Sequence, residues 1–476
     1  MDPLHEREQA IAALDKVARA AADYLTGLDE RQVSDPAAAK LLDELRQPLP
    51  ENGLGTLDSV DELLRVGTAA ATHSAGPRFF HFVIGGTTPA ATAADWVAAL
   101  LDQNAGLWTS SPLATTLETV TLGWLKDLFG LPPDWGGVLT PSATFANLTG
   151  LAAARQWWGS KHGRDVTADG LAGLPAMPVL ASGYVHASVR KALQILGAGR
   201  DTVTVCNRDD AGRVDLDAMD AELGRLDGPA VIVACGGEVN AGDFDPIDAM
   251  ADLAEKHGSW LHVDGAFGLF AALSPRTAHL VDGVNRADSV AADAHKWLNV
   301  PYESGFAFVR EPRTLTDAFG SFGVPYLASV DATQIDYNQL GPESSRRARA
   351  LPIWATLRAY GRAGHRAMIE RHLDLTAHLG RLVEDAPDLE PLAPVQLCIA
   401  CFRYRPPGVA EERLDELNSQ LGKELLADGR VYAGTTVYRG HVALRPAIVN
   451  WRTTQRDIDL LVDVVREIGE RIAVSW

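Results

Sequence analysis

The segment VAADAHKWL occupies residues 290–298 and places a single lysine, Lys296, between two short apolar runs. The first run covers 288–292 and the second covers 305–309, and both are typical of strands in a buried sheet. A lysine held partly out of water gives up its proton more readily, and the neutral amine can attack a carbonyl to form a Schiff base. A lysine at a strand end can equally extend its ammonium group into solvent. The segment alone leaves both roles open.

Length and composition set broad limits on the class of protein. The 476 residues are too many for one core and predict two or three structural units. Hydrophobic residues make up 46% and charged residues 22%, and the net charge of −19 disfavours binding to nucleic acid or to an anionic membrane. Residues 1–7 lack the apolar core of a signal peptide, and no apolar run is long enough to span a membrane. We therefore expect a cytoplasmic globular protein with no nucleic-acid or membrane partner.

The four cysteines are too few for a disulfide framework in so long a chain. Cys398 and Cys401 form a CxxC motif, but the motif lies within 395–402, an apolar stretch that reads as a buried strand. No second pair follows at the spacing of a zinc site. Small core residues are the favoured interpretation, and no bound metal is expected.

The first 76 residues are expected to form a helical segment without strands. Apolar residues recur at helical spacing within 6–26 and again within 60–71. The segment has too few apolar residues for a core of its own, so it should pack on the main body or on a second subunit.

Residues 77–351 are predicted to form a large α/β domain. Short apolar runs alternate there with helices such as 187–196 and 246–257, and Asp245 is expected to cap the second of these helices. This alternation predicts a mostly parallel sheet between helices, with ligands at the carboxyl ends of the strands. The runs lie at 179–181, 203–206, 230–235, 260–263, 289–292 and 306–309.

Residues 352–476 are predicted to form a small C-terminal α+β domain. A long helical stretch runs to residue 382, and strands are expected near 397–404 and 442–449. The closing helix, 457–472, should be capped by Thr454.

Asp264 directly follows an apolar run and precedes Lys296 by 32 positions. That spacing holds a helix and one more strand, so both side chains are expected on neighbouring strand ends that face one crevice. A carboxylate in such a place can keep a pyridine nitrogen protonated, which makes the ring a better electron sink. The alternative is that Asp264 merely caps the helix that follows it.

Residues 139–148 place Ser142, Ala143 and Thr144 at the start of a predicted helix. Free backbone N–H groups and the positive end of the helix dipole could hold a phosphate there, although an ordinary helix cap has the same pattern. His186 opens another predicted helix, where capping is a common role. No P-loop or complete dinucleotide-binding glycine motif is present.

These pieces, in this order, resemble the group II amino acid decarboxylases, which are fold-type I pyridoxal-phosphate enzymes and include aromatic amino acid and glutamate decarboxylases. The resemblance covers residues 77–476. It implies pyridoxal 5'-phosphate as cofactor, an amino acid as substrate and a homodimer. Its densest matches are Pro-Arg-Phe-Phe at 77–80, Ser-Pro at 111–112 with Leu-Glu at 117–118, His-Val-Asp-Gly-Ala at 262–266 and Asp-Ala-His-Lys-Trp at 293–297.

Carried over by position, the resemblance assigns catalytic roles to four residues. Lys296 would hold the cofactor covalently, Asp264 would pair with its ring nitrogen, and His186 would stack on its ring. Tyr326 lies in 324–327, which is similar to the family's mobile catalytic loop once one residue is inserted; an ordinary loop tyrosine is the alternative. The further cofactor contacts implied are Ser142, Ala143, Thr144, Asn240, Ala266, Asp293 and His295.

On the substrate side the resemblance is less complete. It implies that Arg445 contacts a substrate carboxylate and that Phe79, Gly85 and Trp108 lie near the substrate. Several positions depart from the family pattern, which leaves the identity of the substrate open. They are Phe145 in place of an acidic residue, Glu-Val-Asn at 238–240 in place of a Thr-rich run, Val-Ile-Gly-Gly at 83–86 in place of a Pro-Thr pair, Gly106 in place of a ring and Asp293 in place of an asparagine.

The resemblance predicts removal of the α-carboxylate of an L-amino acid to give an amine and CO2. Retention of Tyr326 and His186 favours this reaction over the oxidative, aldehyde-forming variants of the family. The alternatives are that oxidative reaction, other pyridoxal-phosphate chemistry at carbon–carbon bonds, and a non-catalytic homologue that only binds the cofactor. Intact Lys296, Asp264 and His186 argue against the last of these.

Overall fold

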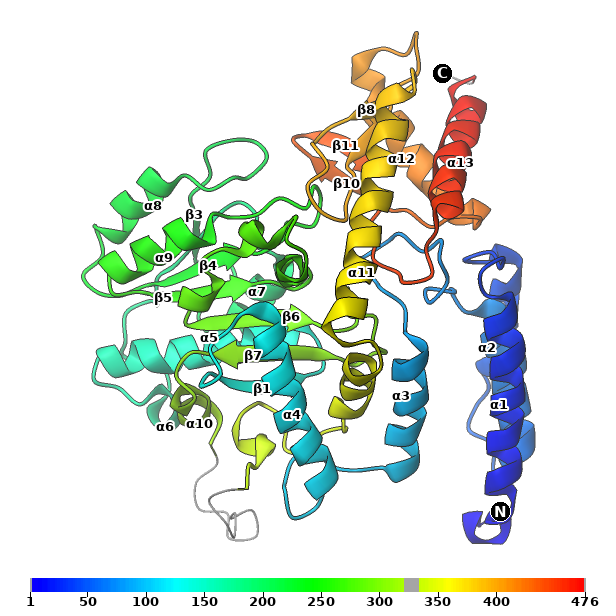
Figure 1. Cartoon of the computed structure of the whole chain (residues 1–476), viewed down its shortest axis with the longest axis horizontal. Coiled ribbons are helices and arrows are strands. Elements are labelled where there is room, and N and C mark those ends of the chain that lie inside the picture. Colours follow the sequence, from blue (N-terminus) through cyan, green and yellow to red (C-terminus); the bar gives the residue numbers. More distant parts are fainter. Residues whose placement is uncertain (1, 321–333, 475–476) are drawn as a thin grey trace.

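The computed structural model describes residues 2–320 and 334–474, and its centre is a seven-stranded sheet (Figure 1). The strand order is β1-β7-β6-β5-β4-β2-β3. β7 runs antiparallel to both neighbours and the remaining pairs are parallel, so the predicted mostly parallel sheet is confirmed. The strands are β1 (Gly136–Thr140), β2 (Val179–Ala181), β3 (Val203–Val205), β4 (Val231–Cys235), β5 (Trp260–Asp264), β6 (Ser289–Asp293) and β7 (Gly305–Val309).

Helices cover both faces of this sheet, and alternate strand residues bury against different helices. Ile232 and Leu261 join one core with residues of α4 and α9, whereas Val231 and Trp260 join another with residues of α5 and α7. The helices of this part are α3 (Pro89–Leu101), α4 (Pro112–Phe129), α5 (Ala143–Lys161), α6 (Val166–Asp169), α7 (Ala187–Ile195), α8 (Leu216–Leu223), α9 (Ile247–Lys256) and α10 (Arg313–Phe319).

Helix α9 is capped differently from the prediction. Pro246 occupies the N-cap position, while Asp245 Oδ2 accepts hydrogen bonds of 2.8 Å from Ser182 Oγ and from the Cys235 N–H. These bonds hold the carboxylate at the sheet edge, so the prediction that Asp245 caps the helix is wrong. Burial raises the pKa of Asp245 to about 7.

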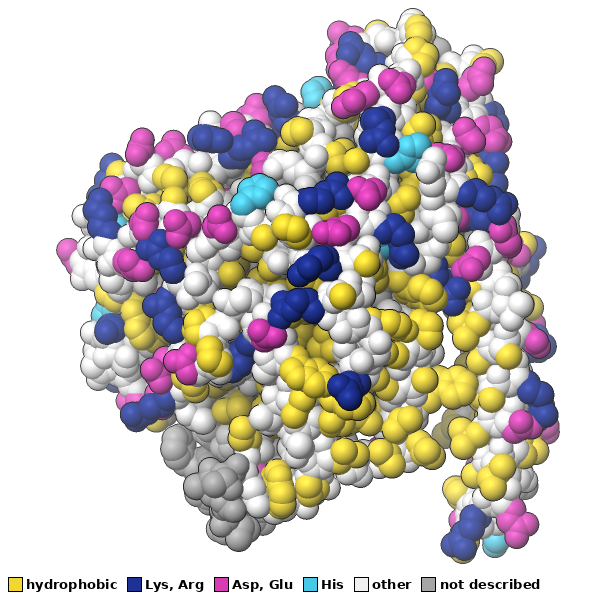
Figure 2. Space-filling model, in the orientation of Figure 1, with side chains coloured by type: hydrophobic (Ala, Val, Ile, Leu, Met, Phe, Trp, Pro, Cys, Tyr) yellow, Lys and Arg dark blue, Asp and Glu magenta, His cyan; other side chains and the backbone are white. Residues whose placement is uncertain are grey.

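The N-terminal segment contains α1 (Gln9–Gly27) and α2 (Thr56–Ala70), which pack against each other. Along most of their length these helices stand apart from the rest of the molecule (Figures 1 and 2). The segment is anchored at one end, where the buried Val33 donates a backbone hydrogen bond of 2.7 Å to Gly429 O. The predicted strand-free helical segment is therefore present in the structure.

The C-terminal part has its own antiparallel sheet, β10-β11-β9-β8, with a separate hydrophobic core. Helix α11 (Ala350–Asp385) connects it to the large sheet region and is interrupted at Gly361, whose φ of 61° is not helical. Thr454 and Asp457 form the predicted capping box. The other elements are β8 (Leu389–Pro391), β9 (Phe402–Tyr404), α12 (Glu411–Asp428), β10 (Thr435–Tyr438), β11 (His441–Leu444) and α13 (Gln455–Ala473).

Two predicted strands of this part are shorter than expected. The buried stretch that contains Cys398 and Cys401 is not a regular strand, and both cysteines are free thiols. Ile399 forms only an isolated bridge with Ala447, because the neighbouring Pro446 has no N–H with which to continue a ladder. Within the described ranges, every helix is too short or too polar to cross a lipid bilayer.

Candidate active site

Asp264 and Lys296 lie at the same edge of the large sheet, as predicted. Asp264 ends β5, which pairs in parallel with β6 so that Asp264 is opposite Ala291. Lys296 follows the end of β6 by three residues, and its side chain is 15% exposed. Its Nζ lies 3.3 Å from Asp293 Oδ2 and 5.9 Å from the centre of the Phe267 ring. The amine thus lies mostly buried beside Asp293 and Phe267 and does not extend freely into solvent.

A chain of hydrogen bonds fixes the buried carboxylate of Asp264. Asn147 Nδ2 donates to Asp264 Oδ2 at 3.1 Å, and the Asn147 Oδ1 lies 2.9 Å from His262 Nε2. Burial lowers the pKa of His262 to about 4, so this imidazole is neutral near pH 7. A neutral His262 that donates from Nε2 accepts at Nδ1, where Ser289 Oγ lies 2.8 Å away. The Ala266 N–H donates to the other oxygen of Asp264 at 3.2 Å.

His186 is the N-cap of α7 and lies close to the same edge. Its Nδ1 accepts from the Ser188 N–H at 3.2 Å and lies 2.8 Å from Ser188 Oγ, which also accepts a bond from Asn147. Burial lowers the pKa of His186; the charge of Asp264 raises it, and the positive charge of Lys296 lowers it again. The capping role considered from the sequence is therefore real, and it also holds the imidazole near Asp264 and Lys296.

The start of α5 lies opposite the lysine segment. Ser142 is the N-cap residue without a side-chain capping bond, and the Ala143 N–H donates to Asp293 Oδ1. The other oxygen of Asp293 lies 3.3 Å from Lys296 Nζ and 3.4 Å from His295 Nε2. Asp293 therefore joins the helix N-terminus to the lysine segment.

His295 is fixed on its other side. Its Nδ1 lies 3.0 Å from Ser304 O, and its ring stacks on Tyr302 with a centroid separation of 4.3 Å. Burial lowers the pKa of His295, although the nearby Asp293 opposes this effect. His295 thus presents Nε2 toward Asp293 and the start of α5.

Gly85 touches the lysine segment through its backbone. Its N–H donates to His295 O at 3.3 Å, and a Cβ added to it would lie only 1.9 Å from Lys296 O. Gly106, in contrast, does not enlarge a pocket, since a Cβ there would lie 2.3 Å from Ser344 O. Phe79 is buried and stacks on Tyr432, and Trp108 donates its backbone N–H to Asp336. Whether Phe79, Gly85 and Trp108 contact a substrate remains a prediction.

Asn240 and Arg445 connect this edge to the C-terminal sheet. Asn240 Oδ1 accepts a hydrogen bond of 2.6 Å from Thr436 Oγ1, and Arg445 Nη1 donates to Val239 O at 3.1 Å. Tyr326, the fourth residue expected to be catalytic, lies outside the described residues.

The residues at this edge fit pyridoxal phosphate. A partly buried amine, a fixed acid on the adjacent strand end and the N-terminus of α5 supply the groups that an aldehyde, a pyridine nitrogen and a phosphate require. Lys296 would hold the aldehyde carbon, Asp264 the ring nitrogen, and Ala143 and Thr144 the phosphate. The fold and these groups together define a fold-type I pyridoxal-phosphate enzyme.

Comparisons with known proteins agree with this class. A family model of the pyridoxal-dependent decarboxylase conserved domain matches residues 41–405. Aromatic-L-amino-acid decarboxylase from Bacillus atrophaeus is 29% identical over 463 residues, with 95% of this chain and 94% of the relative covered. Tryptophan decarboxylase 1 from Oryza sativa subsp. japonica is 30% identical over 436 residues, with 86% and 83% covered.

A relative named for a different activity and a solved structure both match over nearly the whole chain. Phenylacetaldehyde synthase from Petunia hybrida is 27% identical over 474 residues, covering 94% of this chain and 91% of the relative. The crystal structure of Oryza sativa TDC with PLP and tryptamine has a TM-score of 0.90 at 27% identity and covers 99% of both chains. The chain therefore belongs to the pyridoxal-dependent decarboxylase family. It is a pyridoxal-phosphate-dependent amino acid decarboxylase.

Four residues of the site were not predicted from the sequence: Asn147, Ser188, His262 and Ser289. Only His262 carried a usable signal, because it lies two residues before Asp264 on the same strand and therefore on the same face. Asn147 and Ser289 contact His262 from elements that are distant in the sequence, whereas Ser188 lies two residues after His186 and also accepts a bond from Asn147 of α5.

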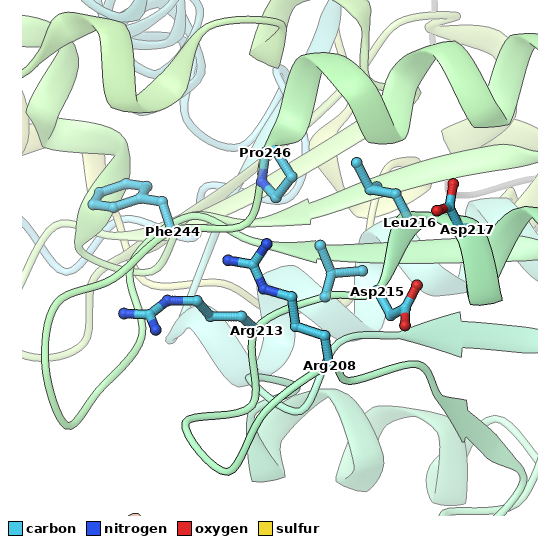
Figure 3. Close-up of a pocket in the computed structure, with 8 residues that line it drawn as sticks. Arg208, Arg213, Asp215, Leu216, Asp217, Phe244 and Pro246 are labelled. Carbon is cyan, nitrogen blue, oxygen red and sulfur yellow. The ribbon is translucent and has the colours of Figure 1, made fainter.

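A separate pocket of about 380 Å³ lies beside the starts of α8 and α9 (Figure 3). Arg208, Arg213, Asp215 and Phe244 are among its lining residues, and none of the residues assigned to the cofactor is. Asp243 and Asp209 already pair with Arg213. This pocket is not the active site.

Proposed function

We propose that this enzyme removes the α-carboxylate of an L-amino acid and releases the corresponding amine and CO2. The observation that carries the proposal is the arrangement of Lys296 and Asp264 at one sheet edge, with Asp264 fixed by Asn147 and His262. Family membership supports it, and relatives named for aromatic amino acids make these the first substrates to test.

Bound pyridoxal phosphate supplies a conjugated ring that takes up the electron pair of the bond that breaks. The residues of this chain hold that ring in place. Lys296 would supply the amine that holds the cofactor's aldehyde carbon. Asp264 would face the ring nitrogen and favour its protonated form, and the bonds from Asn147 and the Ala266 N–H prevent the Asp264 carboxylate from turning away.

A proton must then be returned to the α-carbon. His186 lies close to the same sheet edge, and burial lowers its pKa, which favours the neutral imidazole. It can therefore relay a proton, while Tyr326 is the other candidate donor. Positioned proton transfer of this kind contributes roughly 10²–10⁴ in rate.

Arg445 is the proposed contact for a substrate carboxylate. It follows β11 and is half-buried near His186, whose pKa its positive charge lowers. A guanidinium can bind a carboxylate through two parallel hydrogen bonds, which fixes the orientation of the substrate as well as its position.

Oxidative decarboxylation to an aldehyde is the second candidate. The match to phenylacetaldehyde synthase is the reason to test this oxidative reaction as well. The two reactions differ in their products, since only the oxidative one consumes O2 and water and yields an aldehyde, ammonia and hydrogen peroxide beside CO2. Retention of His186 supports the non-oxidative reaction.

The decisive experiment screens the twenty standard amino acids for CO2 release, with mass spectrometry of the products. We expect an amine for at least one amino acid. Lys296→Ala should abolish both turnover and the visible absorbance of the bound cofactor, whereas Lys191→Ala, at an exposed lysine, should change neither. A Lys296→Ala protein that keeps the absorbance and the activity of the wild type would refute the assignment.

We also propose that the enzyme is a homodimer in which the N-terminal helices pack on the second subunit. Ile11 and Leu14 of α1 are 81% and 57% exposed, and Leu63 of α2 is 63% exposed. Hydrophobic side chains gather on α1 and α2 and on the surface they stand away from (Figure 2). Apolar exposure of this extent is typical of a surface that a partner covers.

A further inference from the structure

The turn formed by residues 238–241 lies beside the active site and depends on a buried carboxylate. It follows β4, whose last residue, Cys235, is paired with Asp264. Glu238 is 4% exposed, and its Oε1 accepts hydrogen bonds from the Asn240 N–H at 2.8 Å and Nδ2 at 2.5 Å. Its Oε2 accepts from the Ala241 N–H at 2.7 Å. Three donors on one buried carboxylate fix the conformation of this turn.

The same turn presents two acceptors to the C-terminal sheet. Val239 O accepts from Arg445 Nη1 at 3.1 Å, and Asn240 Oδ1 accepts from Thr436 Oγ1 at 2.6 Å. Asn240 is bonded directly to the Glu238 carboxylate, and Val239 lies between these two residues in the chain. The carboxylate therefore determines where the guanidinium of Arg445 is anchored.

Arg445 is half-buried and, like the half-buried Arg155, has no carboxylate partner among the described residues. Burial lowers its pKa, and the charge of Glu238 opposes this effect from beyond salt-bridge distance. The one described hydrogen bond of its guanidinium, to Val239 O, leaves most of the guanidinium's N–H donors for other groups. By contrast, the fully buried arginines all form ion pairs: Arg78 with Asp457, Arg346 with Glu118, Arg349 with Glu343 and Arg403 with Glu390.

We propose that Glu238 is a positioning residue that holds the 238–241 turn so that Val239 O directs Arg445 toward the carboxylate of the substrate. This inference rests on the proposed role of Arg445 and deepens it, since it names the group that sets the guanidinium's place. Glu238 does not touch the substrate. Its removal frees the turn, and Arg445 then loses its anchor without losing its charge.

The test compares two ligands that differ only in the α-carboxylate. They are the amino acid with the highest kcat/KM in the twenty-amino-acid screen and the amine it yields on loss of CO2. Each is titrated into the holoenzyme while the absorbance of the bound cofactor is followed. We expect Glu238→Ala to weaken binding of the amino acid about tenfold and binding of the amine less than twofold. An equal effect on both ligands would overturn the proposal for the α-carboxylate.

A second pair distinguishes a side-chain carboxylate from the α-carboxylate. If the screen selects an acidic amino acid, its uncharged amide counterpart is titrated as well. If Glu238→Ala weakens binding of the acidic amino acid and of its amine but not binding of the amide counterpart, Arg445 is assigned to the side-chain carboxylate. The positioning role of Glu238 would then stand. No selectivity in either pair would overturn it.

Asp209→Ala is the matched control. Asp209 organises a turn in the same way, since its Oδ1 accepts from the Ala211 N–H and the Arg213 N–H at 3.1 Å each, but this turn is not one of those at the active site. We expect Asp209→Ala to leave both titrations unchanged. Glu238→Gln keeps one acceptor oxygen and should restore part of the amino acid affinity.

A double-mutant cycle separates this inference from the function on which it rests. If Glu238 acts through Arg445, then adding Glu238→Ala to Arg445→Met should weaken binding of the amino acid less than twofold further. If Arg445→Met does not weaken binding of the carboxylate-bearing ligand, the proposed role of Arg445 itself fails. If Arg445→Met weakens this binding, and the double variant loses affinity by the full product of the two single-variant effects, only the positioning role of Glu238 is refuted.

Discussion

Asn147 Nδ2 donates a 3.1 Å hydrogen bond to Asp264 Oδ2, while its Oδ1 is paired with His262 Nε2 at 2.9 Å. The amide therefore cannot turn without breaking a bond on each side. Because Asp264 is buried, it has little water with which to replace this donor. The orientation of the acid that faces the cofactor is thus set by an amide on α5 and by a neutral histidine on its own strand.

Asn147→Ala should therefore reduce turnover by about ten- to a hundredfold, since a hydrogen bond to a charged group contributes about 1.5–3 kcal/mol. Steady-state kinetics and retention of the cofactor absorbance after dialysis measure the effect. Asn147→Asp places a second carboxylate beside Asp264 and should be worse than the alanine variant. Wild-type kinetics in both variants would show that Asn147 does not support Asp264.

Gly85→Ala should disrupt the lysine segment, because the added Cβ would lie 1.9 Å from Lys296 O and 2.8 Å from Asn299 Nδ2. We expect a large loss of cofactor binding, measured by the visible absorbance of the purified protein. Gly123→Ala is the control, since a Cβ there meets nothing within 4 Å. Normal absorbance in Gly85→Ala would mean that the segment moves aside at little cost.

Asp245→Asn should remove a pH dependence of stability. The pKa of Asp245 is about 7 in the folded state, well above its ordinary value of 3.8, because the side chain is buried. The folded state thus holds an extra proton between about pH 4 and 7, and the wild type loses stability as the pH rises through this range. The loss is at most about 1.4 kcal/mol per pH unit.

Asparagine keeps the oxygen that accepts from Ser182 and Cys235 but does not ionise. The Tm of Asp245→Asn minus the Tm of the wild type should therefore be larger at pH 8 than at pH 5. Thermal unfolding of both proteins at these two pH values measures the difference. A difference in Tm that is the same at both values would contradict the assignment.

Ile11→Glu should weaken the proposed dimer, because it places a charge on an exposed apolar position of α1. Multi-angle light scattering over a concentration series should show a shift toward the monomer mass. Val437→Glu, on the edge strand β10 and 64% exposed, is the control and should leave the mass unchanged. A wild-type protein that is monomeric and fully active would refute the dimer.

Most strands of the large sheet were predictable because they are apolar runs buried along their whole length, as in β2 and β4 to β7; β3, at the sheet edge, is exposed at Thr204 and Val205. The prediction for 179–181 matches β2, and the others differ from β3 to β7 by at most one residue at each end. β1 was missed because it begins with Gly136 and Gly137, which carry no apolar signal. In the C-terminal sheet, Pro446 ended a ladder that the apolar pattern alone would have continued.

The active site was predictable where a residue's place depends on its strand, and not where it depends on tertiary contacts. Asp264 and Lys296 were expected at one edge because Asp264 directly follows one predicted strand and Lys296 lies a few residues after the next. The bonds of Asn147 and Ser188 join α5 to α7 and β5, and no local pattern indicates such contacts. Asp245 shows the same limit, since bonds to Ser182 and Cys235 outweighed its preference for the helix cap.

The imidazole that orients Asn147 also constrains how this chain can change over evolution. A Cβ added to Gly150, two turns after the start of α5, would come within 2.9 Å of the His262 ring. Positions 150 and 262 are therefore coupled, and a lineage that replaces the glycine must first accept a smaller group on the strand. Covariation of this pair among homologues would be the historical trace of that steric constraint.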